Sequence, residues 1–167
     1  MAFEDWSKDD LTQYLQFLLY NYRFMDSFWY IYIEKAHGSD EANRINELVW
    51  GKVAQQAAKD LKARFNITEG GLSAFVRAQK LFPWCILADY QFEERDDEVI
   101  VSVPSCPTQE ARLKRGLDEY PCQKMHYNEF SGFATAIDPR IKVECLFAPP
   151  DEHPPEMFCQ WRFTLGE

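Results

Sequence analysis

The sequence predicts an α+β fold, in which N-terminal helices pack on a small antiparallel sheet of about four strands together with two further helices. Two observations indicate this fold class. Apolar residues recur at helical spacing through most of residues 7–81, and from residue 84 onward the spacing shortens to two in several segments, as in half-buried strands. A chain of 167 residues, 46% hydrophobic and 16% aromatic, has enough apolar material for one core.

Residues 7–36 predict either two helices or one bent helix. Ser7, with Asp10 three residues later, is a start signal, and Gly38 is expected to end the helical segment. Asp26 interrupts the apolar pattern between them. Two roles are open for it: the N-cap of a second helix, or a carboxylate that orients a ligand.

The next elements follow from changes in apolar spacing and from the positions of glycine and proline. We expect helices from 39 or 40 to about 65 and from 72 to 81, and then, after Pro83, a hairpin over residues 84–104. A polar helix to about residue 117 and a helix over about 125–137 come next.

The last fifty residues predict two strands, 141–147 and 159–165, whose apolar side chains each share one face. If these strands pair antiparallel with the connecting loop centred, Cys145 lies opposite Cys159 on the buried face. The alternative is that both cysteines are small apolar residues that fill the sheet face.

We expect a single domain over residues 1–167, with a helical half at 1–82 and a mixed half at 83–167 that carries the cysteine cluster. The net charge of −9 argues against nucleic acid and against an anionic membrane surface as partners. No apolar run approaches the roughly 20 residues that cross a bilayer, and the first residues do not resemble a signal peptide. We therefore expect a cytoplasmic protein.

Four cysteines form the candidate metal site: Cys106, Cys122, Cys145 and Cys159. Thiolate ligands favour zinc, or iron in a cluster. His126 follows Cys122 by four residues, so both side chains share one face if that turn is helical. Unrelated core thiols are one alternative. A catalytic cysteine is another, and Cys106 is the best-placed candidate because a helix is expected directly after it.

Aromatic residues are dense between positions 14 and 32, and ring-lined cavities bind flat or apolar ligands. The alternatives for this segment are plain core packing and a homodimer interface. The candidate ligand-binding residues are Asp26, Trp29, Glu47 and His126.

Several segments resemble an uncharacterised prokaryotic family of unknown function, among them Cys145-Leu-Phe-Ala-Pro-Pro and Phe158-Cys-Gln-Trp. The resemblance covers nearly the whole chain, through residues 26–29, 47–50, 106–117, 120–125, 132–141, 145–154 and 158–163. More distantly, the C-terminal pattern of a cysteine, a loop and a cysteine on an aromatic strand is similar to the 4-vinyl reductase domain. It is similar also to the L-2-amino-thiazoline-4-carboxylic acid hydrolase-like proteins.

The resemblance to the 4-vinyl reductase domain implies a zinc site beside a small-molecule pocket, in a homodimer. Its thiol ligands would correspond to Cys122, Cys145 and Cys159. The chain departs from that pattern because Lys142 stands where a glutamate ligand is expected. Cys106 is the candidate to replace that glutamate.

Three functions are therefore open. The first is a small-molecule-binding or sensor-like domain, homodimeric, with a structural zinc site. The second is a hydrolase of a small cyclic or amide substrate that uses a cysteine or a metal-bound water. The third is a protein-interaction module without a metal, which would use the aromatic N-terminal helices.

Overall fold

The computed structural model describes residues 3–88 and 90–166 and divides into two compact units, Met1–Ala42 and Asn43–Glu167. Its described residues form six helices and four strands, which confirms the α+β class. In chain order these are α1 (Lys8–His37), α2 (Ser39–Arg64), α3 (Gly71–Gln79), α4 (Pro83–Leu87), β1 (Gln91–Glu94), β2 (Glu98–Val103), α5 (Pro107–Leu113), α6 (Gln123–Ile137), β3 (Ile141–Phe147) and β4 (Cys159–Leu165). None of the described helices is long and apolar enough to cross a membrane.

The first unit contains α1, one continuous helix of 30 residues. Ser7 and Asp10 form the expected capping box, and Gly38, at φ 86°, ends the helix as predicted. Asp26 lies inside the helix, so its assignment as an N-cap is wrong. The residues around it include no glycine or proline to interrupt the helical hydrogen bonds.

No residue of α1 is buried, although the helix is rich in aromatic side chains. Rings at four-residue spacing contact one another along one face. The centroids of Tyr20 and Phe24 are 4.4 Å apart, and those of Phe24 and Phe28 are 6.0 Å apart. Phe28 and Tyr32 continue the row at 6.3 Å. This row of rings covers one face of α1 from its middle to its last turns.

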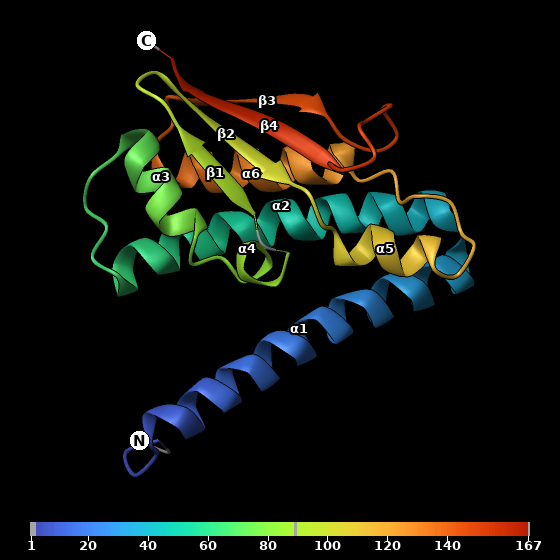
Figure 1. Ribbon diagram of the computed structural model, residues 1–167, viewed down its shortest axis with the longest axis horizontal. Helices are drawn as coiled ribbons and strands as arrows, with labels where there is room; N and C mark the ends of the chain where they lie inside the picture. Colours follow the sequence, from blue (N-terminus) through green and yellow to red (C-terminus); the bar gives the residue numbers. More distant parts are fainter. Residues whose placement is uncertain (1–2, 89, 167) are drawn as a thin grey trace. The chain divides into compact units, whose positions relative to one another are not determined.

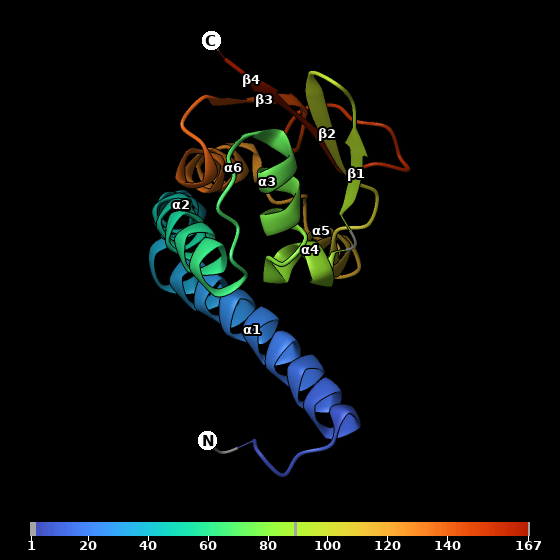
Figure 2. The same cartoon turned by 90° about the vertical axis from the view of Figure 1, so that its left-hand side faces the viewer.

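The second unit contains the predicted four-stranded antiparallel sheet, in the order β1-β2-β4-β3. Figures 1 and 2 show the helices of this unit on one side of the sheet. On the central strand β4, Cys159, Trp161 and Phe163 are buried, while the residues between them are partly exposed. Apolar residues at alternate positions therefore turn the same face of β4 toward the helices.

The pairing of the last two strands differs from the prediction. Cys145 lies opposite Trp161, and Cys159 lies opposite Val103 of β2. The register is shifted by two residues from the expected one, and a β-bulge follows between Cys145 and Phe147. The connecting loop is therefore not centred, and the two cysteines are not cross-strand partners.

The segment after Pro83 is also different from the prediction. Residues 84–87 belong to the short helix α4 rather than to the first strand of a hairpin, and β1 begins only at Gln91. Pro83 occupies the first turn of α4, where its fixed φ suits a helix. The ring of Trp84 packs 6.0 Å from that of Trp50, so tertiary packing holds this segment in the helix.

Helix α6 lies beside the sheet, with α2 on its other side (Figure 2). Its buried residue Phe130 packs against Trp161 of β4, with ring centroids 5.2 Å apart. Glycine permits the close approach to α2, because a Cβ atom added at Gly132 would lie 2.7 Å from the carbonyl oxygen of Gly51. Helix α6 therefore contributes one face to the core and another to the contact with α2.

Candidate functional site

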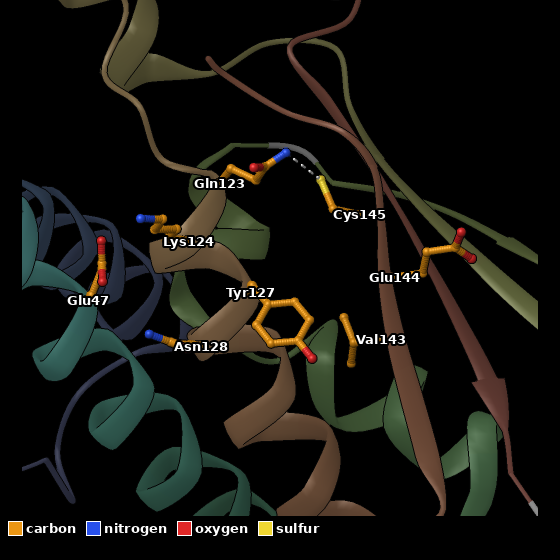
Figure 3. Close-up of a pocket in the computed structure, with 8 residues that line it drawn as sticks. All are labelled: Glu47, Gln123, Lys124, Tyr127, Asn128, Val143, Glu144 and Cys145. Carbon is orange, nitrogen blue, oxygen red and sulfur yellow. Dashed lines mark hydrogen bonds between the residues drawn. The ribbon is translucent and has the colours of Figure 1, made fainter. Parts of the chain in front are cut away.

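A pocket of about 600 Å³ lies between α2, α6 and β3 (Figure 3). Four of its residues come from the first two turns of α6, three from β3 and one from α2. They are Gln123, Lys124, Tyr127 and Asn128, then Val143, Glu144 and Cys145, and finally Glu47. Most of these residues are polar or charged, and Glu47 is the one that the sequence predicted to bind a ligand.

The β3 residues of the pocket alternate in direction, as side chains on a strand do. Figure 3 shows Val143 and Cys145 on the side of β3 that faces α6, and Glu144 on the other side. Glu144 is held by Arg162, whose Nη1 donates to Oε2 at 2.9 Å. Its carboxylate therefore already has a partner outside the pocket.

Cys145 is half-buried and lines the pocket, and the Nε2 of Gln123 donates to its Sγ at 3.6 Å (Figure 3). Burial raises the pKa of the Cys145 thiol to about 11, although the hydrogen bond from Gln123 acts in the opposite direction. Cys145 is therefore a weak nucleophile at neutral pH.

A second constellation lies in the interior, on the face of α6 that is turned toward the sheet. Cys122 is the N-cap of α6, and His126 lies one turn later, with its backbone N–H donating to the Cys122 carbonyl at 2.9 Å. The Nδ1 of His126 is 2.6 Å from Oε2 of Glu129. A thiol, an imidazole and a carboxylate therefore follow one another along two turns of one helix.

The protonation of His126 reflects these two partners. Burial by itself would lower its pKa, but the neighbouring Cys122 side chain and the hydrogen bond with Glu129, together with the charges of both groups, raise the pKa to about 10. Glu129 is only 2% exposed, so its interaction with the imidazole is little screened by solvent. The imidazolium form of His126 is therefore favoured at neutral pH.

Gln109 of α5 completes this buried group. Gln109 is 1% exposed, and its side chain makes two hydrogen bonds with the backbone of Tyr120. Its Nε2 donates to the Tyr120 carbonyl at 2.7 Å, and its Oε1 accepts from the Tyr120 N–H at 2.8 Å. The same Nε2 lies 3.5 Å from Sγ of Cys122 and donates to it. The amide is thus fixed by the backbone, and its second N–H points at the sulfur.

The four predicted metal ligands, Cys106, Cys122, Cys145 and Cys159, all belong to the second unit. The pKa of Cys159 is raised by burial and, to a smaller extent, by the charges of Cys122, Cys106 and Cys145. Burial likewise raises the pKa of Cys106 to about 11. Within residues 3–88 and 90–166, however, no three Cys, His, Asp or Glu side chains are placed to hold a metal ion.

The other predicted ligand-binding residues belong to helices α1 and α6. Asp26 and Trp29 belong to α1, in the first unit, and His126 is in the interior rather than in the pocket. Sequence reasoning missed Gln109 and Glu129. The spacing Cys122-x₃-His126-x₂-Glu129 on one predicted helix was the signal that could have identified the carboxylate.

A family model matches residues 4–165, which is nearly the whole chain, and the family is described as a family of unknown function, DUF6125. No curated protein matches the sequence. The expectation of an uncharacterised family is thereby confirmed. On the extent of this match, the chain belongs to the family of unknown function DUF6125.

Proposed function

We propose that the chain is a small-molecule-binding domain whose ligand occupies the pocket between α2, α6 and β3. What supports the proposal is the pocket itself, because its volume of about 600 Å³ falls in the range of known ligand sites. Its lining combines charged and amide groups with the apolar Val143, so it provides both specific contacts and some desolvation.

The charges in the pocket suggest the class of ligand. The side chains of Lys124 and Glu47 make no hydrogen bond or ion pair with any other described residue, whereas Glu144 is bound by Arg162. A small molecule that carries both a carboxylate and an ammonium group would complement Lys124 and Glu47 together. The proposed ligand is therefore a small zwitterion of the amino-acid type.

The test is thermal unfolding of the protein in the presence of each of the free amino acids in turn. A ligand present at a hundredfold its Kd stabilises the folded state by about 2.7 kcal/mol, which is readily measured. Lys124→Met and Glu47→Gln should each abolish the stabilisation. Glu144→Gln is the matched control and should keep it, because that carboxylate is occupied by Arg162. Stabilisation by no amino acid, or equal stabilisation of all variants, would contradict the proposal.

The zinc site and the homodimer, which the resemblance to the 4-vinyl reductase domain implies, stay predictions. Zinc at the four cysteines is tested by elemental analysis of protein purified without chelators, with Cys145→Ser as the control. The homodimer is tested by light scattering. The observation that favours a partner is the exposure of aromatic residues along α1, such as Trp29 at 66%. We also propose a reducing, cytoplasmic setting, which agrees with five free thiols.

A further inference from the structure

We propose that α1 forms an antiparallel coiled coil with α1 of a second copy of this chain. The coiled coil involves the first unit alone, so it goes beyond ligand binding in the pocket of the second unit and does not depend on it. Three observations support this pairing. They are the spacing of apolar residues along α1, the exposure of those residues, and the charges at the two ends of the helix.

Apolar residues of α1 recur at the heptad spacing of a coiled coil. The eight positions of this heptad seam are separated alternately by four and three residues, and they are Leu11, Leu15, Leu18, Tyr22, Met25, Trp29, Tyr32 and Ala36. Two helices that supercoil around each other have about 3.5 residues per turn, so a repeat of seven keeps one stripe facing the partner along its whole length. The partner that fits this spacing is therefore a second long helix.

The heptad seam is exposed in the chain. None of its members is buried, and Leu15, Met25, Trp29 and Tyr32 are each between 60% and 66% exposed. Monomeric proteins rarely expose a continuous apolar stripe of this length to water, and such a stripe is typical of an interaction surface. The exposure therefore indicates that the seam is covered by a partner.

The size of the seam suits a dimer of two such helices. Each copy contributes three rings, those of Tyr22, Trp29 and Tyr32, together with five aliphatic side chains. Covering the six rings of two copies removes on the order of 1,000 Å² from water. The aliphatic residues add to this area, which brings it towards the roughly 1,600 Å² of a stable interface.

The charges of α1 decide between the two possible orientations. The first turn carries Asp9 and Asp10, and the last turn carries Lys35 and His37. The Nζ of Lys35 is 5.6 Å from the centroid of the Tyr32 ring, so its charge lies beside the seam. In a parallel pair, the acidic ends of the two copies would lie together. In an antiparallel pair, each acidic first turn lies beside a basic last turn, and the helix dipoles are opposed.

The antiparallel orientation also fixes the register. The intervals of the seam are the same when counted from either end, so a twofold axis at the middle of α1 matches all eight positions. The facing pairs are Leu11 and Ala36, Leu15 and Tyr32, Leu18 and Trp29, and Tyr22 and Met25. Every ring is then opposite an aliphatic side chain, which allows the two seams to interdigitate. In a parallel pair in register, each ring would instead face the same ring of the other copy.

The first experiment measures the mass of the full-length protein by sedimentation equilibrium over a wide range of concentration. We expect a dimer. Met25→Glu places a carboxylate in each of the two central layers, and it should raise the Kd of the dimer at least about a hundredfold. Gln16→Glu, the matched control, adds the same charge at an exposed position outside the seam and should leave the Kd unchanged.

Thermal unfolding of each variant would establish that the second unit is folded, and Leu15→Glu is a second variant of the same kind. A native chain that stays monomeric would overturn the proposal, because the seam would then be covered by the second unit or by a different protein. Dimerisation of Met25→Glu and Leu15→Glu with the native Kd would overturn it as well.

The second experiment determines the orientation by disulfide cross-linking. Leu11→Cys and Ala36→Cys, made in separate chains and mixed, should cross-link between copies under mild oxidation, as identified by peptide mapping. Leu11→Cys alone should not cross-link at this position, because its two copies are about 38 Å apart along the axis. The native protein is the control for its five cysteines, which all belong to the second unit. Cross-linking of Leu11→Cys to itself, or none between the two variants, would exclude the antiparallel arrangement.

The third experiment tests the end charges. Lys35→Glu should raise the Kd of the dimer about tenfold, since the pair is symmetric and both ends lose an attraction. This effect should disappear at about 1 M salt, which screens exposed charges. Lys59→Glu, at an exposed position of α2, makes the same change in net charge and should have no effect. Equal effects of the two substitutions would contradict the pairing of acidic and basic ends.

Discussion

The polar side chains on the two faces of α6 differ in burial. On the face toward the sheet, Cys122, His126 and Glu129 are buried or nearly so, and His126 is hydrogen-bonded to Glu129. On the face toward the pocket, Lys124 and Asn128 are exposed. Polar groups that leave water must find partners within the protein, whereas exposed ones keep water as their partner and can exchange it for a ligand. The polar groups of the interior face therefore have partners within the protein, whereas those of the pocket face are in contact with solvent.

The largest difference between the faces should appear when Glu129 is removed. In Glu129→Ala, His126 loses its carboxylate partner in a buried position, and breaking a buried charged pair costs about 3–5 kcal/mol. Urea unfolding at neutral pH would measure the loss in free energy of unfolding. Asn128→Ala, on the pocket face of the adjacent turn, is the control and should cost less than about 0.5 kcal/mol. Equal effects of the two substitutions would remove the distinction between the faces.

Much of the fold could be predicted because it depends on local pattern. The alternating residues 141–147 and 159–165 form β3 and β4 with the expected bounds. The register between them could not be predicted, because a bulge after Cys145 changes the pairing and no local signal marks it. The same holds for α4, where the contact of Trp84 with Trp50, 34 residues earlier, overrides the alternating pattern.

In the candidate site, too, contacts within one helix could be predicted, and contacts between distant elements could not. Cys122 and His126 could be paired from sequence, because four residues on a helix place two side chains on one face. Gln109 could not be included, since its contact with Cys122 depends on how α5 packs against the start of α6. The pocket was equally out of reach, because Glu47 and Cys145 are nearly a hundred residues apart and meet only in the folded unit.

The buried carboxylate of Asp138, at the C-terminal end of α6, can be compared with Glu129, because Asp138 is hydrogen-bonded to its neighbours. Asp138 accepts hydrogen bonds from the Gly71 backbone N–H at 2.8 Å and from Nη2 of Arg140 at 2.7 Å. The Arg140 side chain, with these hydrogen bonds, holds the pKa of Asp138 well below its usual range. Asp138→Asn should cost about 2 kcal/mol at neutral pH, the value for hydrogen bonds to a charged group.

The same residue gives a pH dependence whose sign is fixed. Because the folded pKa of Asp138 is lowered, its stabilisation is present above the unfolded pKa of about 3.9 and is lost as the pH falls below that value. The free energy of unfolding of the native protein should therefore fall between about pH 5 and pH 3 more steeply than that of Asp138→Asn. Parallel profiles for the two proteins would show that the carboxylate contributes no pH-dependent stability.

The smallest change in the free energy of unfolding is expected for Lys124→Met. An effect on binding in this variant can then be separated from an effect on stability. Lys124 has no partner among the described residues, so Lys124→Met should change the free energy of unfolding by less than about 0.5 kcal/mol. Urea unfolding without added ligand would measure this. A loss of 2 kcal/mol or more would place Lys124 in the structural framework, together with Glu129 and Asp138. With stability unchanged, any loss of amino-acid binding in Lys124→Met reports on the ligand contact alone, because the substitution leaves the folded state as stable as before.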